Sequence, residues 1–559
     1  MDIRKLTDAL AASPQIRIDN LKELAALGYR SILSNRPDTE ETNQPSVEEI
    51  RIAAEAAGLD FAHVPVVGGN ISDDDVEAFR RAVRDLPQPI LGFCRTGMRT
   101  TTLWALAQAG SLGVAPVLAA AKQAGYDLSA LRPRLEASAP ARQSTKPSLT
   151  CDVLIVGGGS AGIATAASLL KRRAGLDILI IDPSDRHAYQ PGWTMVGGGI
   201  FKPQDTVRPM SDIMPDGVRW EKAAVAAFEP DQNTVSLTDG RSVGYRMMVA
   251  APGIKLNWAA IEGLEESLGR NGVTSNYRYD TAPYTWSLVQ NLKAGPALFT
   301  QPPMPIKCAG APQKALYLSG DHWFRNGRIN DIDIEFHNAG PVLFGVKDYV
   351  PALMEYMTRY RADLNFGSRL VSLDGPSNTA TFARTADDGT VVDDKRDFAM
   401  IHVCPPQMAP DFIRQSPLAA ASGWIEVDEA TLQHKRFENI FALGDAASTS
   451  NAKTAAAARK QAPIVAANLL AVMVGKKMPC LYDGYGSCPL TVERGKIVLA
   501  EFGYGGKLLP TFPTWMIDGT KPSALAWYLK AKALPPIYWH GMLKGREWLV
   551  SPKLKNEAA

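Results

Sequence analysis

Short apolar runs alternate with amphipathic stretches over the first 135 residues. The runs at 29–35, 60–66 and 89–94 have the length of buried strands, and residues 46–58 and 73–86 between them have the spacing of helices. This alternation predicts a small α/β domain over residues 1–135. Residues 136–150 are rich in Ala, Pro, Ser and Thr, and we expect them to form a linker.

A second α/β pattern begins at Cys151 and opens a region that we expect to extend to residue 500. Its first strand ends in glycines spaced G-x-G-x-x-G, a helical stretch follows, and a second strand ends in an acid. Such glycines let the backbone approach a pyrophosphate, the helix N-terminus offers free N–H groups, and the acid accepts hydrogen bonds from a ribose. The residues expected to bind a dinucleotide here are Gly157, Gly159, Ser160, Ala161, Gly162 and Asp182.

Two later stretches favour FAD as that dinucleotide. "MMVAAPGIKLNW" (247–258) has the pattern of a strand and turn that return from a first dinucleotide domain, and "NIFALGDAASTSNAKTAAAARKQAP" (439–463) has a strand, a Gly-Asp pair and a helix. An acid at such a strand end can bind the ribityl chain. With the first motif, these stretches resemble the flavoprotein superfamily with two dinucleotide-binding domains, which implies a Rossmann-type α/β fold with bound FAD. The further cofactor-binding residues expected are Gln190, Trp193, Gly253, Gly444, Asp445, Lys453 and Thr454.

Members of that superfamily usually carry a second glycine loop for NAD(P)H. Residues 302–310, "PPMPIKCAG", stand in its place here. Prolines remove backbone N–H donors, so we expect no nicotinamide cofactor to bind at this loop. A cysteine, Cys308, stands there instead.

Composition narrows the classes of function. The chain has 559 residues, 46% of them apolar and 21% charged, with a formal net charge of +2, as expected of a globular protein of several domains. So small a net charge argues against nucleic-acid binding as its main purpose. Six cysteines do not make a disulfide framework, and we expect free thiols in a reducing compartment and no metal site. The first residues lack the features of a signal or transit peptide, so we expect a cytoplasmic protein.

Four stretches point to one family of flavoproteins. "RHAYQPGWTMVGGG" (186–199), "KCAGAPQK" (307–314), "KTAAAARKQ" (453–461) and "YDGYGSCPL…IVLAEFGY" (482–504) together resemble sulfide:quinone oxidoreductase of the mitochondrial-like type. The resemblance implies that sulfide reacts at a cysteine pair beside the flavin, that one cysteine holds the sulfur as a persulfide, and that a quinone takes the electrons. A sulfur acceptor such as glutathione, another thiol or sulfite then removes the sulfur. Cys308 matches the family's persulfide cysteine.

The resemblance implies that the second cysteine of the pair directly follows the Gly-Asp of the flavin motif. This chain has Ala446 at that position, so the pair is incomplete there. We take Cys404, at the end of a predicted strand, as a candidate substitute, with a core thiol as the equal alternative. Cys488 matches a cysteine of the family, and we expect it to be structural or near the quinone.

The last segment, residues 501–559, supports a membrane quinone. Aromatic and apolar residues mix there with basic ones, as in "SALAWYLKAKALPPIYWHGMLKGREWLV" (523–550). This pattern suits an amphipathic segment at a membrane interface, and an ordinary packing face is the alternative. We therefore expect peripheral association with the cytoplasmic face of an inner membrane, and we leave a homo-oligomer open.

The N-terminal domain carries its own cysteine motif. Cys94 follows a predicted strand and precedes a helix, and Arg99 completes a C-x4-R loop, "CRTGMR". Loop N–H groups and the helix dipole stabilise a thiolate there, and an arginine binds an oxyanion. Phosphatases use C-x5-R, and the shorter loop looks like that of rhodanese, a sulfur transferase. The domain, with "SNRPDTEE" (34–41), resembles a phosphatase-like family, and we favour sulfur transfer at Cys94 and Arg99 over phosphate hydrolysis.

The sequence therefore predicts a sulfide-oxidising flavoprotein fused to a sulfur transferase domain. The alternative is a tyrosine-phosphatase-like domain fused to an NAD(P)H-dependent dehydrogenase or a redox-sensing flavin module. Asp73, Asp74 and Asp75 could supply a phosphatase general acid, although such a run more often begins a helix.

Overall fold

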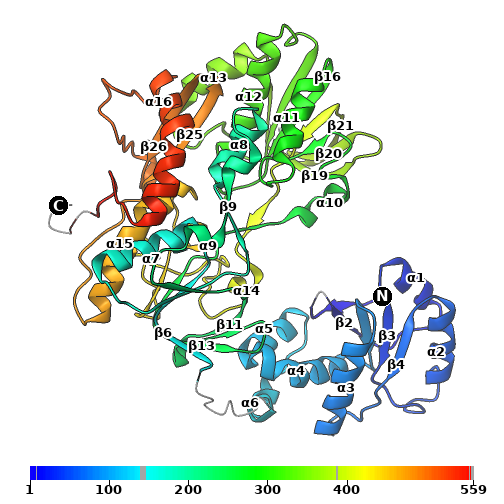
Figure 1. The fold of residues 1–559 in the computed structure, drawn as a ribbon. Coiled ribbons are helices and arrows are strands. Elements are labelled where there is room, and N and C mark those ends of the chain that lie inside the picture. Colours follow the sequence, from blue (N-terminus) through cyan, green and yellow to red (C-terminus); the bar gives the residue numbers. More distant parts are fainter. Residues whose placement is uncertain (8, 139–146, 386–387, 553, 555–559) are drawn as a thin grey trace. The chain divides into compact units, whose positions relative to one another are not determined.

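The computed structural model describes residues 1–7, 9–138, 147–385, 388–552 and 554 (Figure 1). The chain divides into two compact units, Met1–Lys146 and Pro147–Ala559. Most of the expected linker lies outside the described residues, since it includes 139–146.

The smaller unit is an α/β layer with a five-stranded sheet in the order β1-β2-β5-β3-β4. Strands β2 to β5 run parallel where they pair, and β1 pairs antiparallel with β2. The strands are β1 (Arg4–Lys5), β2 (Leu10–Ser13), β3 (Ser31–Ser34), β4 (Asp60–His63) and β5 (Ile90–Phe93). The helices are α1 (Asn20–Ala26), α2 (Val47–Ala56), α3 (Asp73–Asp85), α4 (Met98–Leu112), α5 (Val114–Gln123) and α6 (Arg132–Ser138).

The sequence pattern predicted the central elements of this unit correctly. Strands β3, β4 and β5 and helices α2 and α3 lie within the stretches expected for them. β2 and α1 were not predicted. β5 lies between β2 and β3 and is buried along its whole length, so its carboxyl end, where Cys94 follows, meets the loops of both neighbours.

The larger unit begins with the dinucleotide-binding sheet. Its strands are β6 (Leu149–Val156), β7 (Ile178–Ile181), β10 (Val218–Glu221), β11 (Val225–Glu229), β12 (Thr234–Leu237), β13 (Ser242–Ala250) and β24 (Ile440–Ala442). They lie in the order β10-β7-β6-β13-β12-β11, with β24 also paired to β13. Helices α7 (Ser160–Arg172) and α15 (Ala455–Met473) pack against each other, and α15 is buried over much of its length.

A second sheet carries the cysteine loop. It is parallel, in the order β15-β22-β16-β17-β18, with strands β15 (Val273–Thr274), β22 (Met400–His402), β16 (Gly295–Gln301), β17 (Ile332–Asn338) and β18 (Asp363–Phe366). Around it lie α11 (Ala282–Asn291), α12 (Ala311–Arg325), α13 (Val350–Arg359) and an antiparallel sheet of β19 (Ser368–Asp374), β20 (Thr379–Thr385) and β21 (Val391–Asp397). Smaller pairs and helices connect these layers: β8 (Arg186–Ala188) with β9 (Val207–Pro209), β14 (Lys255–Leu256) with β23 (Gln407–Met408), α8 (Trp193–Gly197), α9 (Met210–Ile213), α10 (Leu264–Ser267) and α14 (Asp411–Arg414).

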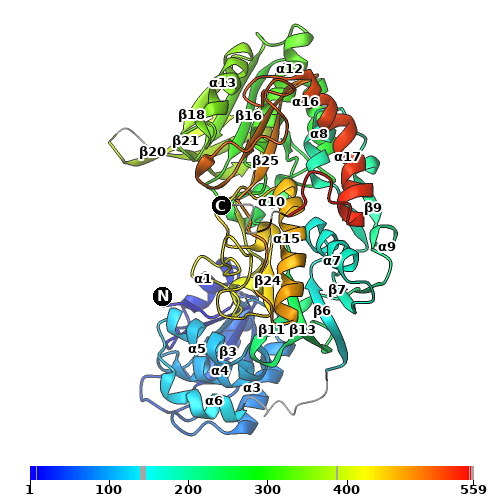
Figure 2. The same cartoon turned by 90° about the vertical axis from the view of Figure 1, so that its left-hand side faces the viewer.

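A hairpin and a helical run complete the larger unit. The hairpin of β25 (Gly486–Glu493) and β26 (Lys496–Phe502) packs on α12. The helical run starts with α16 (Ala524–Tyr528), contains α17 (Leu534–Pro536), and continues to Lys544, lying along β26 at its start and along α7 at its end (Figure 2). Among the described residues, none of the helices has the length and apolar character needed to cross a membrane.

Candidate functional site

A cavity of about 620 Å³ in the larger unit is lined by almost every residue that was predicted to bind the cofactor. The glycine loop after β6, the N-terminus of α7 and the loop after β24 all reach its wall. The predicted residues that line it are Gly157, Gly159, Ser160, Ala161, Asp182, Gln190, Trp193, Gly253, Gly444, Asp445, Lys453 and Thr454. Gly162 instead faces the protein, because a Cβ there would lie 1.9 Å from the carbonyl oxygen of Gly157.

The shape of the glycine loop fits a bound FAD. Gly157 has a φ of +107°, and a Cβ on it would lie 2.4 Å from the carbonyl oxygen of Ala251, so this turn requires glycine. A Cβ at Gly159 would meet nothing within 4 Å, which leaves room for a phosphate at the N-terminus of α7. The carboxylate of Asp182, at the end of β7, accepts a hydrogen bond of 2.7 Å from the N–H of Gly158.

Unpaired polar groups on the same wall also indicate a polar ligand. The indole N–H of Trp193, the hydroxyl of Thr194 and the side-chain amide of Asn276 are buried and have no hydrogen-bond partner among the described residues. Buried polar groups are normally paired, so these groups are suited to bind a cofactor.

Lys453 is a basic residue on the same wall. Burial lowers the pKa of Lys453 to about 8, and this lysine donates a hydrogen bond to the carbonyl oxygen of Asp445 at 2.8 Å.

Cys308 lies on the wall of this cavity, in the segment between β16 and α12. Its Sγ is 3.7 Å from the Sγ of Cys488 in β25, and the Nζ of Lys314 in α12 donates a hydrogen bond to it at 3.0 Å. The hydrogen bond from Cys488 lowers the pKa of Cys308 well below its ordinary value, against the effect of burial, and the charge of Lys314 adds to this. The same contact and burial raise the pKa of Cys488. Cys308 is therefore the thiolate of the pair.

Cys404 does not line the cavity, although Cys308 packs against the buried cluster that contains it. Its side chain is 1% exposed and packs with Tyr277 and Ile306, and burial raises its pKa to about 12. The cysteine whose sulfur meets Cys308 is Cys488, which the sequence analysis had set aside as structural or near the quinone. The contact with Cys308 makes Cys488 a candidate for the second thiol beside Cys404.

The C-terminal run supplies another part of the cavity wall. The Nζ of Lys530 binds the carbonyl oxygen of Pro191 at 3.0 Å, and burial lowers the pKa of this lysine to about 8. The hydroxyl of Tyr538 lies 2.6 Å from Nε2 of His187. One side of the run is thus a packing face, with Tyr538 and Leu543 buried, whereas Leu525 and Tyr528 are exposed.

Lys314 and Lys530 are site residues that the sequence analysis missed. Lys314 follows Cys308 by six positions inside the family stretch "KCAGAPQK", and that stretch could have identified it. Lys530 could not have been placed, because its contact with Pro191 joins residues 339 positions apart.

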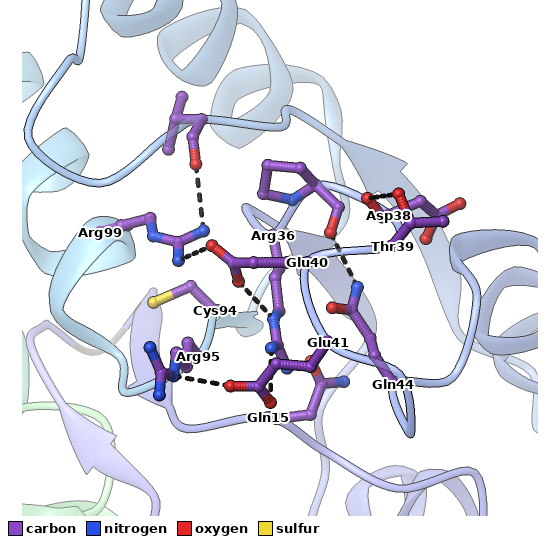
Figure 3. Close-up of polar contacts among 12 residues, drawn as sticks. Gln15, Arg36, Asp38, Thr39, Glu40, Glu41, Gln44, Cys94, Arg95 and Arg99 are labelled. Carbon is purple, nitrogen blue, oxygen red and sulfur yellow. Dashed lines mark hydrogen bonds and ion pairs between the residues drawn. The ribbon is translucent and has the colours of Figure 1, made fainter.

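The smaller unit holds a separate candidate site around Cys94 (Figure 3). Cys94 directly follows β5 and is fully buried, and the N–H of Gly97 donates to its Sγ at 3.2 Å. Gly97 has a φ of +87°, and a Cβ on it would lie 1.9 Å from the hydroxyl oxygen of Tyr126, so the loop requires glycine. Arg99, in the first turn of α4, binds the carbonyl oxygen of Val66 at 3.1 Å and the carboxylate of Glu40.

The acidic run at 73–75 begins a helix. The hydroxyl and N–H of Ser72 bind the carboxylate of Asp75, and the N–H of Asp75 binds the hydroxyl of Ser72, which is a complete capping box for α3. The acidic run therefore begins and caps helix α3, which was the structural alternative to a phosphatase general acid.

Two family models match the chain. The model described as "Beta-lactamase hydrolase-like protein, phosphatase-like domain" matches residues 2–111, and the model described as "Pyridine nucleotide-disulphide oxidoreductase" matches residues 151–283.

Individual proteins match the same two parts. The mitochondrial sulfide:quinone oxidoreductase of Dictyostelium discoideum is 41% identical over 409 residues, which cover 72% of this chain and 88% of that protein. A beta-lactamase hydrolase-like protein of Xylella fastidiosa is 40% identical over 108 residues, which cover 19% of this chain and 25% of that protein. The solved structure of the sulfide:quinone oxidoreductase from Aquifex aeolicus covers 72% of this chain and 92% of its own, with a TM-score of 0.59 at 19% identity, and thus shares the fold.

Proposed function

Because the chain belongs to the sulfide:quinone oxidoreductase family, we propose that its larger unit oxidises sulfide with FAD and passes the electrons to a quinone. The observation that carries this proposal is the contact of Cys308 with Cys488 and Lys314 on the wall of the cavity. FAD would be held by the glycine loop after β6, by Asp182 and by the unpaired groups of Trp193 and Asn276.

Cys308 is the residue to which the sulfur of sulfide is transferred. Hydrogen sulfide and the Cys308 thiol form one S–S bond, and two protons and two electrons leave. When bound, FAD supplies the two-electron carrier between this step and the quinone, which becomes a quinol by taking up two electrons and two protons. Lys314 stabilises the negative charge on the sulfur of Cys308, and Cys488 places a second thiol beside it.

The persulfide leaves by thiol exchange. A small thiolate such as glutathione attacks the outer sulfur of Cys308, the S–S bond to Cys308 breaks, and the Cys308 thiolate is regenerated. Lys530 is another cation on the cavity wall, and it favours the approach of anionic sulfur species.

Attachment to a membrane surface gives the larger unit access to a quinone. Apolar side chains are exposed at and before α16: Trp515 is 82% exposed, Tyr528 62% and Leu525 47%. Such side chains can insert among lipid headgroups, as expected of a peripheral protein. The face of the membrane stays a prediction, namely the cytoplasmic face of an inner membrane.

The smaller unit is proposed to transfer sulfur at Cys94. The N–H of Gly97 donates a hydrogen bond to the sulfur of this residue, and Arg99 follows in the first turn of α4, where its guanidinium can bind an anionic group. The fusion supports this role, because the larger unit produces sulfane sulfur that another thiol must accept.

Anaerobic reduction by sulfide tests the proposed function. Sulfide added to the purified holoprotein should bleach the flavin absorbance, and a short-chain quinone should restore it. Cys308→Ser should abolish the bleaching, and Cys151→Ser, a change in the first strand of the dinucleotide sheet, should not. Absence of bleaching in the unchanged protein would overturn the proposal.

A further inference from the structure

The arginine of the Cys94 loop is already bound to a carboxylate (Figure 3). Glu40, in the loop after β3, forms an ion pair with Arg99, and its other oxygen accepts a hydrogen bond of 2.7 Å from Nε of Arg36. Arg36 is 2% exposed, so this carboxylate bridges a buried guanidinium and the guanidinium that would bind an oxyanion.

A second carboxylate extends the network. Glu41 lies 2.9 Å from Nη2 of Arg36 and 2.9 Å from Nε of Arg95, which is the residue after Cys94. The loop that carries both glutamates is tied together by the amide of Gln44, which donates to the carbonyl oxygen of Pro37 at 2.8 Å. The two glutamates are therefore part of a folded loop with fixed partners.

Both glutamates carry their charge at neutral pH. Burial acts to raise the pKa of Glu40, but hydrogen bonds from Arg36 and Arg99 lower it below its ordinary value. The hydrogen bond from Arg36 likewise lowers the pKa of Glu41. A carboxylate in this state is a poor general acid, so neither residue suits the protonation of a phosphatase leaving group.

The charges at the site nearly cancel. Three arginines and two glutamates are joined in the network and leave one net positive charge. A substrate oxyanion that binds Arg99 must displace Glu40 and stay near Glu41. The electrostatic repulsion between the Glu41 carboxylate and the substrate grows with the charge of the substrate.

We propose that Glu40 and Glu41 determine the substrate class of the Cys94 site, selecting singly charged persulfides over dianionic donors such as thiosulfate or phosphate esters. This inference rests on the proposed sulfur transfer by Cys94. In the favoured reaction the Cys94 thiolate attacks the outer sulfur of a persulfide, R–S–S⁻, and the products are R–S⁻ and a persulfide on Cys94. With thiosulfate the same S–S bond forms and sulfite leaves, so both reactions balance without an added oxidant or reductant.

The test compares two sulfur donors on the full-length protein. Cysteine persulfide and inorganic thiosulfate are each offered, and the mass gain of one sulfur atom on the Cys94 peptide is followed over time. The unchanged protein should react faster with the persulfide. Glu40→Gln and Glu41→Gln should each raise the rate with thiosulfate about tenfold, because a carboxylate near the dianion is removed, and should change the persulfide rate much less.

Glu48→Gln and Glu55→Gln are the matched controls, since they remove carboxylates that pair with Arg51 on the exposed face of α2. They should leave both rates unchanged. The side chain of Glu41 is 48% exposed, so Glu41→Gln tests the proposal even where Glu40→Gln disturbs the loop.

The outcomes separate the two claims. If neither donor adds sulfur to Cys94 of the unchanged protein, sulfur transfer itself is refuted, and the inference with it. If sulfur is added but the ratio of the two rates is the same in Glu41→Gln as in the unchanged protein, the inference alone is overturned.

Discussion

Replacing Lys314 with methionine should raise the pKa of the Cys308 thiol by about one to two units. The Nζ of Lys314 is 3.0 Å from the sulfur of Cys308, and methionine keeps the length of the side chain without the charge. A hydrogen bond to a charged group contributes about 1.5–3 kcal/mol, and one pKa unit corresponds to about 1.4 kcal/mol, which gives this range. Because only the thiolate reacts, the midpoint of the alkylation profile should move to higher pH, and at a pH below both midpoints the rate should fall about 10- to 100-fold.

The assay is the pH profile of iodoacetamide alkylation at Cys308, read by peptide mass spectrometry on the holoprotein. Lys496→Met is the matched control, since the Nζ of Lys496 pairs with the carboxylate of Glu493 at 3.0 Å on the hairpin of β25 and β26. A Lys314→Met profile with the same midpoint as the unchanged protein would refute the role given to Lys314.

Three further changes test other parts of the structure. Gly162→Ala should abolish retention of FAD, because its Cβ would lie 1.9 Å from the carbonyl oxygen of Gly157. Gly345→Ala, where a Cβ has open space, should retain FAD. The flavin content after gel filtration measures both outcomes. Burial lowers the pKa of His402 from 6.5 to about 4, so the unfolded chain binds more protons in that range and stability should fall as the pH drops from 6.5 to about 4. His402→Gln should flatten this slope in thermal unfolding, and an unchanged slope would exclude His402 as its cause. Trp515→Ser with Tyr528→Ser should weaken binding to liposomes about tenfold or more in co-sedimentation, and unchanged binding would place the membrane contact elsewhere.

Local patterns were enough to predict the parts of the fold that depend on neighbouring residues. The glycine spacing from Gly157 to Gly162 and the acid at Asp182 lie within one βαβ unit, and the structure arranges them as expected. The Cys94 loop also lies between a strand and a helix that the pattern predicted. In these cases the spacing along the chain determines the spacing in the fold.

Contacts between distant segments could not be predicted in the same way. Cys308 and Cys488 are 180 positions apart, and they meet because the hairpin of β25 and β26 packs on α12. Nothing near Cys488 in the sequence indicates this packing, so the sequence alone did not mark Cys488 as the second thiol. The ion pair of Glu40 with Arg99 spans 59 positions and was missed for the same reason.

The identity of the second thiol is tested most directly by anaerobic sulfide titration of Cys488→Ser beside Cys404→Ser, followed by flavin absorbance. The contact of Cys308 with Cys488 predicts that Cys488→Ser loses rapid bleaching and that Cys404→Ser keeps it. Rapid bleaching in Cys488→Ser together with its loss in Cys404→Ser would contradict the account and return Cys404 to the site.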